Sequence, residues 1–222
     1  MLRLRSLAML VVLLGVACSS AQQQVVSSFL TAVQTGNEDA AKAASLVEFP
    51  GGVESWEIVE VGPVSSEPFA FAALQVKLSE LSRERRAEKD NNAYFVQNHQ
   101  SAFDKYTAKH EKDPEYEFSG EVAEFQKEWE EKRRAAEELD RAATEVYKEM
   151  SHLKSAAGLS LSTTVNENFE GETSATDLIL KVNDGSTEKT YMFTLQKFDL
   201  IDTERNISPI GRWVITDIEE QA

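Results

Sequence analysis

The stretch DLILKVNDGSTEKTYMFTLQKF, residues 177–198, contains two apolar runs with an Asn-Asp-Gly sequence between them. Asp-Gly between apolar runs is a strong signal for a β-hairpin, because the turn requires positive φ angles. In the second run Tyr191, Phe193 and Leu195 alternate with other residues, so they share one face of a strand. The stretch therefore predicts two antiparallel strands, each with one face toward a core and one toward water.

Two further runs predict strands before and after this hairpin. SWEIVEV, residues 55–61, is dominated by β-branched residues and is followed by a Gly-Pro pair. GRWVITDI, residues 211–218, follows a polar loop, and Trp213 and Ile215 alternate along it. Residues 160–172 are compatible with one more strand. The C-terminal part of the chain is therefore expected to form an antiparallel meander.

Two short helices are predicted before the first strand. VVSSFLTAVQT, residues 25–35, places its apolar side chains on one helical face, and Gly36 stops the helix. Asn37 then caps a second helix, with Glu38 and Asp39 in the first turn, where the helix dipole favours acids. Helices followed by antiparallel strands predict the α+β fold class.

Residues 66–157 differ from the rest, because apolar or small residues recur there with heptad spacing. The sequence SEP at 66–68 is a helix start with proline in the first turn, and Pro114 is the one strong break. Two heptad helices joined by a short break predict an antiparallel coiled-coil hairpin that Gly158 ends. At ~1.5 Å per residue each helix would be roughly 60 Å long, so the hairpin should project into solvent.

The predicted seam of this hairpin contains a polar patch in its middle. Arg85, Glu88 and Asn92 occupy seam positions where apolar residues are expected. Polar seam residues can fix the register of the two helices at a cost in stability. Alternatively, the weak point is where the arm bends or opens for a partner.

Trp129 is the aromatic residue of the predicted seam that raises a functional question. A thin two-helix coil cannot bury a tryptophan fully. Trp129 either packs on His99 and Phe125 or marks a contact with a partner. Because the seam is also apolar at Phe118 near its end, our candidate partner-binding residues are Trp129, Phe125 and Phe118.

The N-terminal residues predict export. Arg3 and Arg5 precede an apolar run at residues 7–14 that is too short to span a bilayer, and small residues follow it. This pattern is typical of a signal peptide, assigned here to residues 1–17. Cys18 follows directly and is the only cysteine of the chain, which excludes an intramolecular disulfide and any multi-cysteine metal site.

The sequence LLGVAC, residues 13–18, resembles the lipobox of bacterial lipoproteins, although Gly15 stands where that family prefers leucine. The resemblance implies that lipid is attached to the Cys18 thiol and that the signal is cut before this residue. A fatty acid such as palmitate then acylates the new N-terminus. Ser19, in place of aspartate, resembles an outer-membrane address in a bacterium with two membranes. The alternative is an ordinary secretory signal cut after Ala21.

The order of elements outside the helical hairpin resembles the nuclear-transport-factor-2-like fold found in small bacterial lipoproteins. That resemblance rests on the helical pair before SWEIVEV and on the last strand GRWVITDI. It implies helices packed on a curved antiparallel sheet, which a large insertion interrupts here. The expected division is a signal at 1–17, a tether at 18–24, a discontinuous α+β domain at 25–65 and 158–222, and the hairpin at 66–157.

The charge of the chain and the motifs that it lacks narrow the classes of function that we expect. The chain carries 38 acidic and 23 basic residues, a formal net charge of -15, and so acidic a surface is expected to repel nucleic acid and anionic lipid headgroups. We find no catalytic constellation: His99, His110 and His152 all lie on the predicted hairpin and are interpreted as structural or merely solvated. No cofactor or metal site is predicted, since VNDGST lacks the repeated acids of a calcium loop.

Three functions therefore compete. The first is a non-catalytic cell-envelope lipoprotein that is attached to the membrane by its N-terminal lipid and uses its hairpin to bind another envelope protein. The second is a small-molecule binder or enzyme that uses a pocket of the α+β domain. The third is a structural protein that assembles with itself by pairing of hairpins.

Overall fold

The hairpin predicted from residues 177–198 is present and is longer than expected. The computed structural model describes residues 20–221, and in it β3 (Phe169–Asn183) pairs with β4 (Glu188–Asp202) along its whole length. The Asp184 carboxylate closes the turn by accepting hydrogen bonds from the backbone N–H groups of Ser186 and Thr187, both at 2.8 Å. The extra strand considered within residues 160–172 is the first part of β3.

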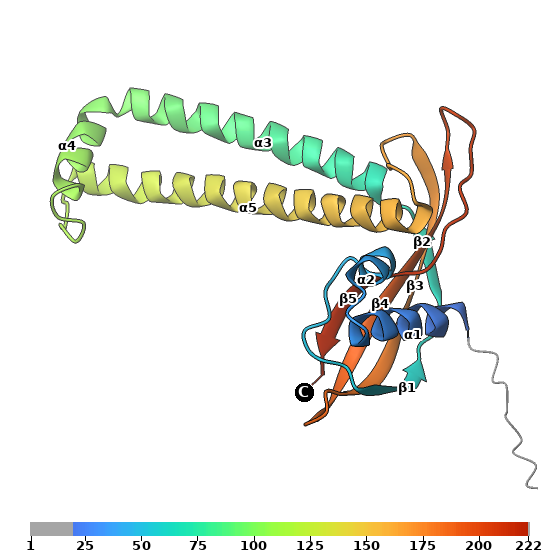
Figure 1. Ribbon diagram of the computed structural model, residues 1–222. Helices are drawn as coiled ribbons and strands as arrows, with labels where there is room; N and C mark the ends of the chain where they lie inside the picture. Colours follow the sequence, from blue (N-terminus) through green and yellow to red (C-terminus); the bar gives the residue numbers. More distant parts are fainter. Residues whose placement is uncertain (1–19, 222) are drawn as a thin grey trace, which may run out of the picture.

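Three other strands complete an open antiparallel sheet. β1 (Ser55–Val61) and β2 (Ser65–Pro68) both pair with β3, and β5 (Val214–Glu220) pairs with β4 (Figure 1). The strand order is β1-β3-β4-β5, with β2 also on β3. Together with five helices in residues 20–221, this sheet confirms the α+β class.

The prediction of a helix start at residues 66–68 is wrong. These residues belong to β2, which pairs with Glu172–Ala175 of β3, and the helix begins only at Phe71. Pro68 can end this strand because it has no N–H to donate, and the next N–H, of Phe69, bonds the carbonyl of Gly171 at 2.9 Å. Pairing with a strand a hundred residues away thus overrides the local signal.

Two helices lie before the sheet in sequence, as predicted. α1 (Ala21–Gln34) begins four residues earlier than expected, because Ser20 and Gln23 form a capping box. Ser20 Oγ accepts from the N–H of Gln23 at 3.3 Å, and Gln23 Oε1 accepts from the N–H of Ser20 at 2.8 Å. α2 (Glu38–Ala44) is capped by Asn37. The segment expected to be a tether is therefore helical from Ala21 onward.

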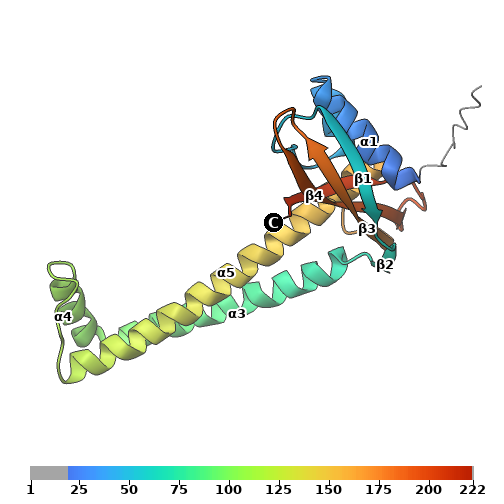
Figure 2. The same ribbon diagram turned by 90° about the horizontal axis from the view of Figure 1, so that it is seen from below.

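The sheet has a separate hydrophobic core on each face. α1 packs on Leu178, Phe193 and Leu195, whereas the end of α5 (Glu121–Leu161) packs on Phe198 and Leu200. Side chains alternate between faces along a strand, so Leu195 and Phe198, three residues apart, point in opposite directions. Figure 2 shows α1 and α5 on the two sides of the sheet.

Three helices form the arm that projects from the sheet. α3 (Phe71–Asn98) and α5 run in opposite directions side by side, and α4 (Gln100–His110) crosses their far end (Figures 1 and 2). The expected single helix up to Pro114 is thus broken at His99. The ring Nδ1 of His99 lies 3.0 Å from the carbonyl oxygen of Phe95, and the backbone of His99 is no longer helical.

The predicted end of the second long helix at Gly158 is also wrong. α5 continues to Leu161 and ends at Ser162, which adopts a left-handed conformation with φ of 53°. The carbonyl of Gly158 accepts hydrogen bonds from the N–H groups of Ser162 and Thr163. Gly158 therefore lies inside the last turn and serves its C-cap.

The polar patch in the middle of the arm has two different parts. Arg85 Nε forms an ion pair with Asp140 Oδ1 at 3.1 Å, and both side chains are more than half exposed. Such an exposed pair contributes at most about 1 kcal/mol. The Oδ1 atom of Asn92, by contrast, is buried and has no hydrogen-bond partner among the described residues. An unpaired buried acceptor destabilises the helix pair at that level.

Replacement of Asn92 by leucine is therefore expected to stabilise the arm, by about 1 kcal/mol. Hydrogen exchange of α3 and α5 amides should slow in the Asn92→Leu protein. The matched control is Asn91→Leu, which changes the exposed neighbour and should leave exchange unchanged. Faster exchange in Asn92→Leu than in wild type would contradict this assignment.

Candidate functional site

The far end of the arm contains its own hydrophobic cluster, which we call the tip cluster. It is built from the last turn of α3, from α4 and from the first turns of α5. Its aromatic members are Phe95, Phe103, Tyr106, Phe118, Phe125 and Trp129. The cluster belongs to neither of the two cores on the sheet, so the tip is held in shape by its own residues.

Phe125 lies at the centre of the tip cluster. Its side chain is only 3% exposed. Its ring centroid lies 5.3 Å from that of Phe95, 5.9 Å from that of Tyr106 and 6.0 Å from that of Phe103. These spacings are those of stacked and edge-to-face aromatic pairs, which contribute beyond the area they bury. Phe125 is therefore a core residue of the tip.

Trp129 packs on Phe125, which agrees with one of its two interpretations. Its ring centroid is 6.2 Å from Phe125, 6.4 Å from Phe95 and 6.0 Å from Phe103. The predicted contact with His99 is not among its ring contacts; His99 packs on Phe95 at 4.5 Å instead. Trp129 stays partly exposed to solvent.

Phe118 lies at the outer edge of the tip cluster and is half-buried. It packs on Tyr106 at 5.4 Å and on Tyr116 at 5.0 Å. Tyr116 itself is 43% exposed, and Lys109 Nζ lies 5.2 Å from its ring centroid. The three candidate residues thus belong to one cluster, with Phe125 inside and Phe118 and Trp129 at its rim.

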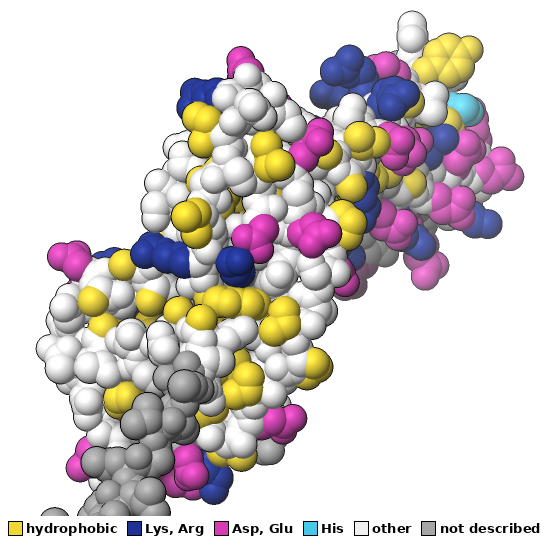
Figure 3. Space-filling model, turned by 90° about the vertical axis from the view of Figure 1, so that its right-hand side faces the viewer, with side chains coloured by type: hydrophobic (Ala, Val, Ile, Leu, Met, Phe, Trp, Pro, Cys, Tyr) yellow, Lys and Arg dark blue, Asp and Glu magenta, His cyan; other side chains and the backbone are white. Residues whose placement is uncertain are grey.

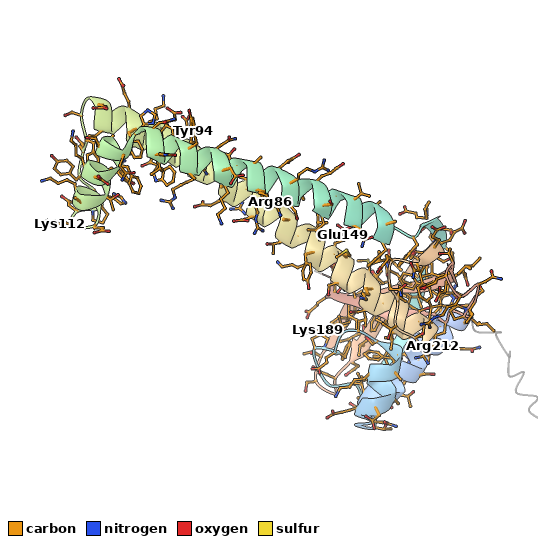
Figure 4. All side chains as sticks on the ribbon, turned by 90° about the horizontal axis from the view of Figure 1, so that it is seen from above. Arg86, Tyr94, Lys112, Glu149, Lys189 and Arg212 are labelled. Carbon is orange, nitrogen blue, oxygen red and sulfur yellow. The ribbon has the colours of Figure 1, made fainter. Side chains whose placement is uncertain are left out.

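Two exposed tyrosines flank the tip cluster: Tyr116 packs on Phe118, and Tyr94 precedes Phe95 in the sequence. Tyr94, near the end of α3, is 67% exposed, and Tyr116 follows α4 (Figure 4 labels Tyr94 and, at the far end, Lys112). Neither tyrosine was predicted as a site residue. Tyr116 lies in the connection around Pro114, where no heptad pattern applies, so no periodic signal could have identified it. Exposed tyrosine and half-buried tryptophan are enriched where proteins bind each other.

The phenol of Tyr106 gives the tip cluster a pH dependence. Burial, with a smaller contribution from the charge of Glu130, raises the pKa of Tyr106 above its ordinary value of 10.0. The phenol of Tyr106 therefore ionises more easily in the unfolded chain than in the folded one. Its contribution to the stability of the tip is complete below pH 10.0 and is lost as the pH rises through the raised pKa. We expect Tyr106→Phe to retain more protection in α4 at such pH, measured by hydrogen exchange. Tyr94→Phe is the control and should behave as wild type.

The α+β domain contains a second candidate site, a cleft of about 410 Å³. It lies between the end of α1, α2 and residues 45–49, and its lining includes Phe29, Phe49 and the Lys42–Glu38 ion pair. Phe193 fills the space beneath, in contact with both phenylalanine rings. The cleft is therefore a surface hollow beside the helices, and the space between α1 and the sheet is packed.

Several other expectations can be placed only in part. Trp56 and Trp213 pack against the core on the α1 face, as expected. Cys18 lies outside the described residues. Within residues 20–221, no group of three or more His, Cys, Asp or Glu side chains is placed to hold a metal ion. No helix in this part of the chain is long and apolar enough to cross a membrane.

Comparison with known proteins gives no match: no family model, no curated protein and no solved structure resembles this chain significantly.

Proposed function

We propose that this protein is a non-catalytic lipoprotein of the cell envelope that binds another envelope protein through the tip of its arm. In this proposal α3, α4 and α5 are a coiled-coil hairpin inserted into a nuclear-transport-factor-2-like domain. Cys18 carries the lipid, and the outer membrane is the favoured location. The observation that carries the proposal is the tip cluster, a separate aromatic core at the end of a long arm.

The position of the tip cluster supports a binding role. α5 has 41 residues, which at ~1.5 Å per residue gives a length of roughly 60 Å. An aromatic core at this distance contributes nothing to packing on the sheet. It does keep Phe118 and Trp129 at the rim, and Tyr116 on Phe118, in a fixed position far from the α+β domain. A rigid aromatic surface loses little conformational entropy when it binds.

The tip also has the mixed chemistry of a protein interface. Lys109 lies over Tyr116, and Lys132 Nζ lies 5.3 Å from the ring centroid of Phe95. Apolar contact area is thus combined with cations, in a chain whose overall charge is strongly negative. We expect a partner surface with an apolar pocket that accepts these aromatic side chains.

Capture of partners from membranes tests this proposal. The tagged full-length protein is crosslinked mildly, solubilised in detergent and compared with a Tyr94→Ser/Tyr116→Ser variant. The matched control is Tyr147→Ser, because Tyr147 is 60% exposed but lies on the shaft of α5. A partner retained by the control and lost with the tip variant supports the proposal. Equal captures from all three proteins contradict it.

A second candidate function uses the cleft between α1 and α2. Its volume of about 410 Å³ lies within the range of sites that bind small molecules. Phe29 and Phe49 offer apolar contact, and Lys42 lies at the charged side of the cleft. A small anionic or apolar ligand that raises the unfolding temperature of wild type but not of Ala41→Trp would favour this function. Hairpin pairing remains a third candidate, and sedimentation that finds only monomers would exclude it.

A further inference from the structure

The first turn of α1 brings the predicted lipid site close to the α+β domain. Ser20 is the N-cap of α1, held by the capping box with Gln23. Cys18 precedes Ser20 by two residues, and two residues span at most about 7 Å. A lipid on Cys18 would therefore hold the start of α1 directly at the membrane surface, without a flexible tether.

Beside the first turns of α1 lies a groove of about 570 Å³, which we call the anchor groove. Its other wall is formed by Lys197 of β4 and by the segment Gly211–Trp213 that precedes β5. Figure 4 shows Arg212 next to α1. Val25 and Trp213 give the anchor groove an apolar part.

The charge of the anchor groove differs from that of the whole chain. The formal net charge is -15, yet Lys197 and Arg212 line this groove and no acidic side chain does. Lys197 Nζ is paired with Asp199 at 2.9 Å, just outside the groove. The Arg212 guanidinium donates to the carbonyl of Leu159 at 3.3 Å and is otherwise exposed. Arginine in this setting can bind a lipid phosphate.

The loop that leads into the anchor groove carries exposed isoleucines. Ile210, directly before Gly211, is 93% exposed, and Ile207 is 54% exposed. Arg205 lies on the same loop. Figure 3 shows hydrophobic, basic and acidic side chains side by side on this face of the domain. Apolar side chains flanked by arginine suit the boundary between lipid headgroups and acyl chains.

We infer that this face rests on the membrane, with Ile207 and Ile210 entering the headgroup boundary and Arg212 binding anionic lipid phosphates. The inference rests on the proposed lipidation of Cys18. Cys18 lies at most about 7 Å from the N-cap of α1, and Ala21, the first residue of this helix, lines the groove, which argues for a membrane as the occupant. Lys197 and Arg212 in the groove are complementary in charge to phosphatidylglycerol, whereas the end of β4 and the loop after it also carry Asp199, Asp202 and Glu204.

Site-directed spin labelling tests the inference on the full-length lipidated protein. Cys18 is the only native cysteine, so a modified Cys18 leaves the introduced thiol of Ile210→Cys as the only one free. The labelled protein is reconstituted into vesicles of phosphatidylethanolamine and phosphatidylglycerol. The labelled protein is measured first in detergent-free buffer with carrier and then in these vesicles. In the vesicles the label at residue 210 should become more accessible to oxygen and less accessible to a water-soluble nickel complex. The matched control is Lys112→Cys at the tip, which should report water.

Two further arms separate the possible failures. Mass spectrometry of the purified protein reads the state of Cys18, and an unmodified thiol overturns both the proposed lipoprotein and this inference. A lipidated protein whose residue 210 stays in water overturns the inference alone and leaves the face open to a protein partner. Ile210→Cys combined with Arg212→Gln should show shallower insertion on anionic vesicles, and equal depth would contradict the role of Arg212.

Discussion

Gly211→Ala is expected to cause a large loss of stability in the α+β domain. Gly211 is buried between β4 and the end of α5, and a Cβ placed there would overlap the carbonyl oxygen of Phe198. The same Cβ would lie 2.9 Å from the carbonyl carbon of Phe198 and 3.3 Å from Ser160 Oγ. The first two atoms belong to the backbone of a buried strand, so they cannot move aside as a flexible side chain would.

The expected loss is about 3 kcal/mol of unfolding free energy, measured by urea denaturation. Gly52→Ala is the matched control, since nothing lies within 4 Å of a Cβ built at that position. It should unfold within about 0.5 kcal/mol of wild type. Identical unfolding midpoints for the two variants would show that the Gly211 segment can shift away from β4.

Phe125→Ala is expected to loosen the tip of the arm without unfolding the sheet. Removal of a buried phenylalanine costs about 3–5 kcal/mol, and Phe125 contacts most of the aromatic rings of the tip cluster. Because that cluster is separate from the two cores on the sheet, the loss should be local. Hydrogen exchange should become faster in α4 and in the first turns of α5, while β3 and β4 keep their protection.

The control for this prediction is Tyr94→Ala, which removes an aromatic side chain that is 67% exposed. It should change exchange in α4 by less than the equivalent of about 0.5 kcal/mol. If Phe125→Ala also exposed β3 and β4 to exchange, the arm and the sheet would unfold as one unit, and the tip cluster would not be independent.

The strands were predictable because their signals are local. The predicted strand SWEIVEV is β1 with the same bounds, Ser55–Val61. The Asp-Gly turn located the β3–β4 hairpin, since a positive φ at Gly185 is a property of the turn itself. The full length of β3 was less visible, because its first residues are polar and are held by pairing with β2 and β4.

The errors occur where a distant segment or a side chain decides the backbone. Residues 66–68 carry a good helix start, yet pairing with β3 draws them into a strand. His99 fits the heptad pattern, but its ring lies against the carbonyl of Phe95, and α4 turns away. The early start of α1 was readable in principle, because Ser20 and Gln23 have the spacing of a capping box.

The candidate site, like the fold, was predictable in part. Heptad spacing identified Phe118, Phe125 and Trp129, and the structure places all three in one cluster. Phe103 was not identified, because it reaches the cluster only through the turn of α4. The exposed tyrosines were missed for a related reason: Tyr94 lies off the seam, and exposure cannot be read from periodicity.

Hydrogen bonds between the end of α5 and the segment before β5 fix the base of the arm, which we call its root, to the sheet. Ser160 Oγ donates to the carbonyl of Arg212 at 2.6 Å, and the N–H of Arg212 donates to the carbonyl of Ser160 at 3.1 Å. If Arg212 lies on lipid as proposed, the root of the arm and the plane of the bilayer share one residue. The length of the arm would then set the height above the membrane at which a partner can bind the tip, and partners closer to the membrane or farther from it would be excluded.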